Sequence, residues 1–440
     1  MRPDTVQIRR AHGFTLVELM IAMTLGLLIM AALVTLFVDT SRTNREMAKT
    51  NSQIENARFA LQLLEEDFVH GGYWGGFVPQ FDDLTYEDVP TDTPAAIPDP
   101  CTAFASWDAA YFNGVKGMPV QFYNGVPTGC SGVVTNKQAN TDVVVVRHAE
   151  TCELSWNKTG TATADACSNP VTHSGGAWMP GRCNTDGDWI ANSCAAYDAG
   201  QVYFQPSRCE LELQGTPPKR YVIDTATTDF DLHARQCTGG SPVTGRAAPI
   251  YRFISHIYYI RQCATLNVDG TCADSIPTLV RSEFRVQGGT GEHRAAEALV
   301  EGVQALRVEL GVDHISDSGN NIVTTCPASP FSPPYAQTCY RAAVKWADPD
   351  DRDSPTNRGD GVPETFVHCG AGCSVDQLNN AAAVRIFVLA RANEPTPGYT
   401  DTKTYTLGGQ TLGPFNDGFK RHVFSNTVRF VNVASRRETP

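Results

Sequence analysis

The chain has 440 residues, enough for a large folded domain or for more than one. Only 19% of the residues are charged, and 37 glycines with 27 prolines predict many turns and short strands, which disfavours an all-helical protein. The formal net charge of -12 argues against nucleic-acid binding through the bulk surface, because neutralising phosphates requires clustered Lys and Arg.

An apolar segment near the N-terminus predicts a membrane-spanning helix. The twenty positions from Leu19 to Val38 contain no charged residue. A helix of about 20 apolar residues is long enough to cross the hydrocarbon core of a bilayer. The flanking basic residues are equal in number, with Arg2, Arg9 and Arg10 before the segment and Arg42, Arg45 and Lys49 after it. Counting charges therefore leaves the orientation open.

The start of this segment differs from an ordinary secretory signal. Such a signal has a short apolar stretch closed by a small-x-small cleavage site, and neither feature is present. The apolar run instead begins at the junction Gly13-Phe14 and contains Glu18. An ionised carboxylate close to hydrocarbon is costly unless it is paired. Glu18 therefore either has a specific partner or lies at the level of the lipid headgroups.

The helix is expected to continue beyond the membrane with one apolar face. Apolar residues recur at spacings of three and four at Ile54, Ala57, Leu61, Leu64 and Phe68. The opposite face is polar, with Glu55, Arg58, Gln62, Glu65 and Glu66. Gly71-Gly72 provides a stop. We expect one helix over 14–70, with 14–38 in the membrane and 39–70 as an amphipathic stem, on the order of 80 Å long in total.

The remainder of the chain predicts an α+β fold with antiparallel sheets, because strands do not alternate with long helices. Expected strands in its first part are Thr141–Arg147, Tyr251–Ile260 and Thr278–Val286. A second set is expected to cover the stem: Leu306–Val312, Ala383–Ala390, Tyr405–Leu407 and His422–Val433. We divide this globular part into residues 71–240, which include a cysteine-rich insertion between Cys152 and Cys237, and a β-rich part over 241–440.

The cysteines predict disulfides formed in an oxidising compartment. All 14 lie between Cys101 and Cys373, and no Cys-x-x-Cys pair occurs. His368, Cys369 and Cys373 resemble half of a zinc site, but ligands for a second half are missing, which favours a short bridge between these two cysteines or separate partners for each. The candidate disulfide residues are Cys101, Cys130, Cys152, Cys167, Cys183, Cys194, Cys209, Cys237, Cys263, Cys272, Cys326, Cys339, Cys369 and Cys373.

Motifs of common enzyme classes are not found: there is no Gly-x-Ser-x-Gly, Walker loop, His-Glu-x-x-His or dinucleotide fingerprint. We therefore expect no enzymatic activity and no cofactor. One acidic segment offers oxygen ligands of the kind that calcium prefers. The candidate ligands are Asp348, Asp350, Asp353 and Asp360. Their spacing does not match an EF-hand loop, so a solvated loop is the default interpretation.

The residues Gly13 to Leu19 (GFTLVEL) resemble the class III signal of type IV pilins and pseudopilins. The resemblance implies that a prepilin peptidase cleaves after Gly13 and methylates the new amino group of Phe14. It also implies that Glu18 meets the Phe14 amine of a neighbouring subunit in a filament. Two opposite charges that both leave water are tolerated as a pair.

Four further blocks resemble the PilW family of minor pilins: Arg58–Gly75, Ala298–Asp313, Val384–Arg391 and Val423–Asn432. The resemblance implies a pilin-like lollipop with a long N-terminal helix packed on antiparallel sheets and an enlarged disulfide-rich head. It also implies a minor pilin that joins pilins of the FimU, PilV and PilX types in a tip complex, which primes assembly and helps to display an adhesin of the PilY family.

The same resemblance implies where the chain resides and what it contacts. Before assembly it would be a single-pass protein of the inner membrane with a periplasmic head, and afterwards part of the pilus fibre or tip in a Gram-negative bacterium. Further partners would be the major pilin, the prepilin peptidase and the inner-membrane assembly platform. The alternatives are a J-type pseudopilin of type II secretion, an adhesin or DNA-uptake subunit whose head itself binds a ligand, and an anchored periplasmic enzyme.

Overall fold

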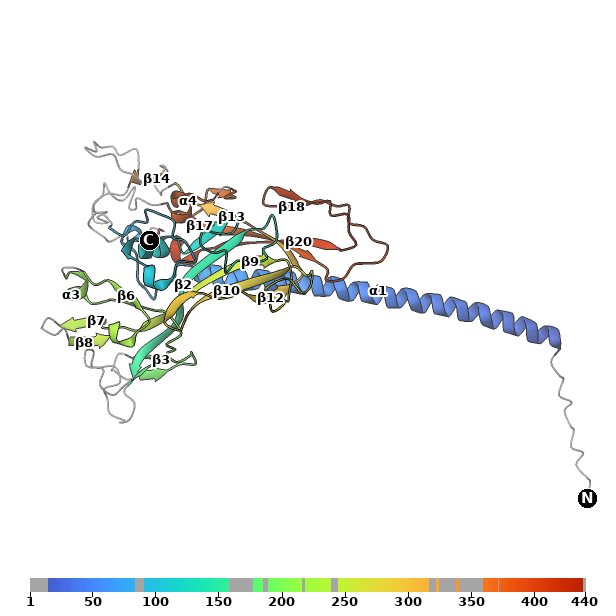
Figure 1. Cartoon of the computed structure of the whole chain (residues 1–440), viewed down its shortest axis with the longest axis horizontal. Coiled ribbons are helices and arrows are strands. Elements are labelled where there is room, and N and C mark those ends of the chain that lie inside the picture. The colour runs from blue at the N-terminus through green and yellow to red at the C-terminus, as the bar shows by residue number, and fades with distance from the viewer. Residues whose placement is uncertain are drawn as a thin grey trace, which may run out of the picture. The chain divides into compact units, whose positions relative to one another are not determined.

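The computed structural model describes residues 15–83, 91–157, 177–184, 189–215, 218–238, 244–315, 322–323, 338–339, 359–370 and 372–437. Figure 1 shows the order of the helices and strands. The chain divides into two compact units, Met1–Gln53 and Ile54–Pro440, and we call the second unit the head. The long helix α1, Leu16–His70, belongs to both units and is drawn in blue.

The last turns of α1 form the amphipathic stem that the sequence predicts. Buried side chains recur every three or four residues at Ala57, Ala60, Leu64 and Phe68. All five members of the predicted polar face are exposed, namely Glu55, Arg58, Gln62, Glu65 and Glu66. The helix ends at His70, and Gly72 then takes a positive φ of 77°, a conformation that glycine adopts without steric cost.

The larger sheet has ten strands and is antiparallel in every pairing. Its main path runs β11-β10-β9-β2-β3-β4, while β1 pairs with β2, β12 with β10, and β5 with both β6 and β9. Its strands are β1 Val120–Tyr123, β2 Val143–Asn157, β3 Ala177–Cys183, β4 Trp189–Ala191, β5 Tyr203–Pro206, β6 Tyr221–Asp224, β9 Ile250–Arg261, β10 Thr278–Gln287, β11 Thr290–His293 and β12 Glu297–Glu301.

The smaller sheet contains most of the C-terminal strands in the order β16-β13-β17-β20, again antiparallel. Its strands are β13 Val303–Val312, β16 Thr365–Val367, β17 Ala381–Arg391 and β20 Arg421–Arg429. Residues close in sequence thus contribute to both sheets, since β12 in the larger sheet directly precedes β13 in the smaller one.

The main hydrophobic core forms where both sheets meet the stem. Ala60, Leu64 and Phe68 share one cluster with Val146 on β2 and Leu306 on β13. The same cluster includes further buried side chains from β1, β9, β10, β17 and β20: Val120, Phe122, Tyr258, Ile260, Leu279, Val384, Ile386, Val388 and Val428. The α+β fold with its N-terminal helix packed on antiparallel sheets is therefore confirmed.

Two of the strands expected to cover the stem differ from the prediction. The segment Tyr405–Leu407 forms β18 and pairs with β19, Gln410–Leu412, but its buried side chains pack with Ala305 and Leu389 in a separate cluster. Ala305 and its neighbour Leu306 point to opposite faces of β13, because side chains alternate along a strand. Tyr405–Leu407 therefore covers the face of the smaller sheet that is turned away from the stem.

The second difference concerns the end of the chain. The expected strand His422–Val433 ends early, because β20 stops at Arg429 and the chain then forms the short helix α5, Val431–Ala434. Val433 packs from this helix into the stem core. The other elements are η1 Gln80–Asp82, η2 Phe104–Ser106, α2 Ala109–Gly117, α3 Glu210–Leu213, η3 Thr227–Asp229, β7 His233–Thr238, β8 Thr244–Ala247, β14 Ile322–Val323, β15 Thr338–Cys339 and α4 Val375–Asn379.

Disulfides join neighbouring segments of the head. The pairs placed within the described residues are Cys101–Cys130, Cys152–Cys194, Cys263–Cys272 and Cys369–Cys373. Cys183 and Cys209 are also disulfide-bonded. The side chains of Cys167, Cys237, Cys326 and Cys339 lie outside the described part of the chain. The predicted use of cysteines in disulfides is confirmed, and Cys369 and Cys373 adopt the first of the two arrangements considered for them, a bridge to each other.

Candidate functional site

The N-terminal half of α1 exposes apolar side chains on all of its faces. Its most apolar 18-residue window has a mean hydropathy of 2.6 and no buried residue, so this helix is long and apolar enough to cross a membrane. The large apolar side chains from Leu16 to Val38 are between 53% and 74% exposed. A surface of this kind requires lipid or other apolar helices to cover it.

Glu18 lies near the start of this apolar surface and belongs to a capping box at the helix N-terminus. Thr15 is the N-cap residue, and its Oγ1 accepts a hydrogen bond from the backbone N–H of Glu18 at 3.3 Å. In return, Glu18 Oε2 accepts from the Thr15 backbone N–H and from Thr15 Oγ1, both at 2.9 Å. The reciprocal bonds satisfy backbone donors that the helix leaves unpaired. Glu18 therefore has a local function besides the intermolecular one that the sequence suggests.

The structure places only one of the three predicted processing and assembly residues. Gly13 and Phe14 lie outside the described residues, so their processing stays a prediction. Glu18 is exposed, and all of its hydrogen bonds within the described chain are to Thr15.

A polar cluster that the sequence analysis missed attaches the stem to the larger sheet. Asp67 projects from α1 toward β2 and β9. Its Oδ2 accepts hydrogen bonds from His256 Nδ1 at 2.5 Å and from the Tyr258 hydroxyl at 2.6 Å. Its Oδ1 lies 3.6 Å from His148 Nε2, an ion-pair distance. We call these four residues the Asp67 cluster.

The environment of Asp67 favours its charged form. Burial raises the pKa of this carboxyl group, but the imidazoles of His148 and His256 outweigh that effect and hold its pKa well below the usual value. Burial, followed by the negative charge of Asp67, raises the pKa of Tyr258 well above its ordinary value, so the hydroxyl stays protonated as a donor. The cluster thus supplies a fixed, directional contact between the stem and the larger sheet.

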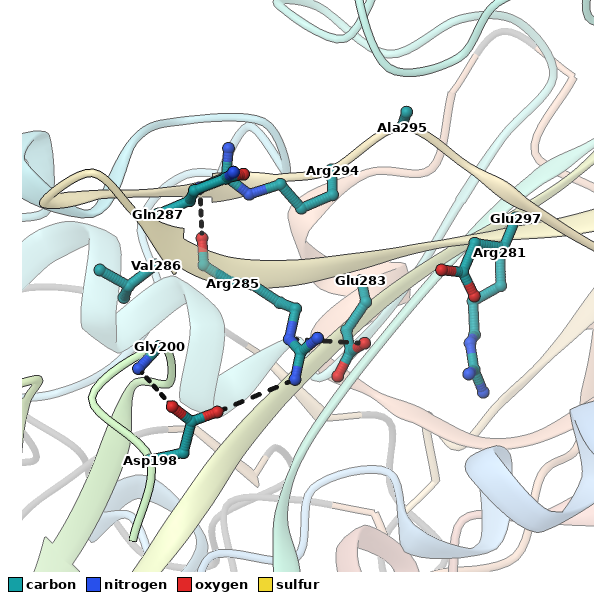
Figure 2. A pocket seen from close by; sticks show the side chains of 10 residues that line it. All are labelled: Asp198, Gly200, Arg281, Glu283, Arg285, Val286, Gln287, Arg294, Ala295 and Glu297. Atoms are coloured by element: carbon teal, nitrogen blue, oxygen red, sulfur yellow. Dashed lines mark hydrogen bonds and ion pairs between the residues drawn. The ribbon is translucent and has the colours of Figure 1, made fainter.

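A charged groove lies on the head and is shown in Figure 2. It has a volume of about 690 Å³, and it is lined by the segment around Asp198, by strand β10 and by residues between Arg294 and Glu297. Its charged side chains balance: Arg281, Arg285 and Arg294 against Asp198, Glu283 and Glu297. Figure 2 shows Arg285 between Asp198 and Glu283, and both ion pairs are long, at 3.9 Å. The groove is a solvated ion-pair surface.

The calcium candidates receive little support from the described residues. Asp348, Asp350 and Asp353 lie outside them, while Asp360 groups with Asp313 and Glu364. The Asp313 carboxylate already accepts from the Gly361 N–H at 2.8 Å and forms an ion pair with Arg437 at 3.2 Å. Both contacts are made by Asp313 Oδ2 and pair its charge within the chain, and we assign no metal to the group.

Comparisons with known proteins give two family matches. The family described as type IV pilus-assembly protein W matches residues 257–432, which include β10, β13, β17 and β20. The prokaryotic N-terminal methylation motif matches residues 8–34, which include Glu18. No curated protein matches the chain. A type IV-like pilin from Thermus thermophilus matches among solved structures, with 14% identity and a TM-score of 0.18 over 42% of this chain and 70% of that chain.

Replacing Asp67 with Asn is expected to weaken the packing of the stem on the sheet. The charged acceptor of two hydrogen bonds is lost, so the free energy of unfolding should fall by about 1.5–3 kcal/mol in urea titrations. Glu66→Gln, the matched change at the exposed neighbouring position, should alter it by less than about 0.5 kcal/mol. Equal effects of the two substitutions would show that the Asp67 cluster does not hold the stem.

Because of the buried His293, we predict that the free energy of unfolding decreases as the pH is lowered from neutral to about 4.5. Ser255 and Ser282 contact its ring nitrogens at 3.1 and 3.2 Å, and burial, followed by the charges of Arg147 and His256, lowers its pKa to about 3. Below the ordinary histidine pKa of about 6.5, His293 binds a proton in the unfolded chain but stays neutral in the folded chain. Stability should therefore fall with pH by about 1.4 kcal/mol per unit.

The test is a urea titration of the full chain in detergent at several pH values from 7.5 to 4.5. His293→Gln retains hydrogen-bonding capacity toward both serines and should remove most of this slope. Asp67 should not contribute to the pH dependence in this range. A carboxylate with a lowered pKa loses its stabilising effect only below its unfolded-state pKa of about 3.9. Parallel pH curves for the two proteins would contradict the assignment.

Proposed function

We propose that this chain, which belongs to the PilW family of type IV pilus-assembly proteins, primes the assembly of a pilus and stays in its tip complex. It is a type IV pilus minor pilin and a structural protein, not an enzyme. Its membrane-anchoring helix fits a location in the inner membrane before assembly, with the head in the periplasm. After assembly the chain would belong to the pilus at the cell surface.

The observation that supports the proposal most strongly is the exposed apolar half of α1 with an acidic residue at its start. Among the residues that the structure describes, none covers the apolar side chains around this helix. Lipid covers them while the subunit waits in the membrane, and neighbouring helices cover them in a filament. Transfer between these two environments costs little hydrophobic free energy, because both are apolar.

Glu18 controls this transfer in our proposal. Cleavage after Gly13 would create a free amino group on Phe14, one residue before the N-cap Thr15. A carboxylate that enters an apolar filament core must keep a partner, and the amine of a neighbouring subunit supplies an opposite charge. Glu18 has a second oxygen, Oε1, besides the one that accepts from Thr15. One side chain can therefore cap its own helix and bind a neighbour.

The head would make the specific contacts. We propose that it joins minor pilins of the FimU, PilV and PilX types and that the complex presents an adhesin of the PilY family at the pilus tip. The major pilin would polymerise beneath this complex on the inner-membrane assembly platform. The two-sheet head, with its stem fixed by the Asp67 cluster, suits a rigid contact surface, and the acidic net charge disfavours a role in binding DNA.

Three substitutions separate the two functions of Glu18. Glu18→Ala removes both the cap and the charge, Glu18→Gln keeps a side chain able to cap but removes the charge, and Thr15→Val removes the cap but keeps the carboxylate. Copurification with the other minor pilins from detergent-solubilised membranes is the measurement. We expect both Glu18 variants to lose roughly tenfold or more of the partner pilins and Thr15→Val to retain them.

The outcome is interpreted with the membrane content of each variant as the control. All three proteins should reach the membrane in similar amounts and keep the thermal unfolding of the head, because residue 18 lies outside it. If Thr15→Val fails to copurify while Glu18→Gln succeeds, Glu18 acts through its helix cap and not through a charge on its neighbour.

A further inference from the structure

A pocket beside the Asp67 cluster brings histidines and carboxylates together. It lies where the last turns of α1 meet β2 and has a volume of about 270 Å³. The side chains in its lining that can bind a metal are Glu66, Asp67 and His70 from α1 and His148 and Glu150 from β2. Asp67 and His70 are three positions apart on the helix, which places them on one face. Imidazole and carboxylate groups together are ligands that divalent transition metals prefer.

Backbone carbonyl groups hold both imidazole rings of this pocket. His70 Nδ1 lies 2.8 Å from Glu66 O, and His148 Nδ1 lies 2.9 Å from Ala149 O. A carbonyl oxygen only accepts hydrogen bonds, so Nδ1 is the donor in each ring, and Nε2 keeps its lone pair when the ring is neutral. Histidines that bind a metal through one ring nitrogen commonly donate the other one to a carbonyl or carboxylate in this way.

His148 Nε2 faces the Asp67 carboxylate across a gap that a cation can fill. The His148 side chain is 7% exposed, and its Nε2 lies 3.6 Å from Asp67 Oδ1. Within the described residues this nitrogen has no hydrogen-bond partner. When His148 is neutral, two acceptor atoms face each other here, an arrangement that a positive charge between them stabilises. Two ligand atoms on one tetrahedral zinc ion are about 3.4 Å apart, close to the separation observed.

Asp67 is oriented as a ligating carboxylate usually is. Its Oδ2 accepts the hydrogen bonds from His256 and Tyr258, which leaves Oδ1 as the oxygen beside His148. Hydrogen bonds of this kind fix the direction of a ligating group and increase its affinity for the metal. The lowered pKa of Asp67 keeps the carboxylate ionised at neutral pH, as metal binding requires.

His70 is the third ligand candidate. Its ring centroid lies 5.6 Å from that of His148, and two imidazoles on one zinc ion are separated by roughly 5 Å. The ligand atoms of Asp67, His70 and His148 do not all lie within 4.8 Å of one another. The half-buried His70 ring would therefore move inward as the metal binds.

The charge of the pocket favours a cation. Three carboxylates line it, those of Glu66, Asp67 and Glu150, against one guanidinium, that of Arg281. With neutral histidines the pocket has a net negative charge, which attracts a divalent cation. Glu66 is exposed at the position next to Asp67, so its carboxylate or a water molecule can complete a four-coordinate site.

We propose that Asp67 Oδ1, His148 Nε2 and His70 Nε2 bind one divalent transition-metal ion, for which Zn²⁺ is the best match to the ligand set. The ion would join the last turn of α1 to β2 and so clamp the stem to the larger sheet, in addition to the hydrogen bonds of the Asp67 cluster. The site is a property of the head alone and does not depend on the proposed function.

The experiment measures Zn²⁺ binding by the full chain in detergent, purified without a polyhistidine tag and stripped with a chelator. Calorimetric titration with ZnCl2 should show one ion bound with a Kd of about 1 μM or lower. His70→Ala should weaken this binding by about tenfold or more, and His148→Gln should do the same. His422→Ala, which replaces an exposed histidine on β20, is the matched control and should bind like the wild type.

Thermal unfolding measures the clamp itself. Saturating ZnCl2 should raise the Tm of the wild type and of His422→Ala by at least about 3 °C and leave that of His70→Ala unchanged. Scans in chelator check that each variant folds. If His70→Ala and His148→Gln bind Zn²⁺ as tightly as the wild type, the ion is adventitious and the assignment is wrong. If the wild type binds no Zn²⁺, a proton rather than a metal links His148 to Asp67, and the proposal is likewise overturned.

Discussion

Helix α1 exposes apolar side chains on every face of its N-terminal half, and the rest of the molecule is organised around that constraint. The same helix buries one face among two sheets at its other end, where Ala60, Leu64 and Phe68 enter the main core. A folded chain that leaves so large an apolar surface uncovered requires a second apolar environment. The match to the N-terminal methylation motif fits a membrane-anchored pilin, and we propose that neighbouring pilin helices replace the lipid after assembly.

The carboxylates near the two ends of this helix, Asp67 and Glu18, differ in the partners that stabilise their charge. Asp67 receives its partners within the chain, from His148, His256 and Tyr258, so the stem is fixed on the head before any other subunit binds. Within the described part of the chain, Glu18 has hydrogen bonds only to Thr15, and this capping box leaves a net charge. We propose that a neighbouring subunit neutralises that charge, which would make assembly selective for correctly processed neighbours.

The sequence predicted features that depend on local periodicity and missed those that depend on distant contacts. The stem stripe, its polar face and most of the strands follow from spacings that one segment contains. The Asp67 cluster does not, since His256 lies 189 residues from Asp67 along the chain. The prediction that Tyr405–Leu407 covers the stem is wrong, because the sequence of a three-residue strand does not indicate which face of a sheet it will cover. Disulfide pairing was undetermined for the same reason, since spacing alone allows many connections.

The central claim is that processing creates the amine that Glu18 binds, and the N-terminus of the native protein tests it most directly. Intact-mass and N-terminal peptide mass spectrometry of the chain purified from membranes or sheared pili should show a mature protein that begins with methylated Phe14. A chain that retains Gly13, or that begins at any other residue, would contradict the account, because no charged partner would then be available at the position where the carboxylate enters the filament.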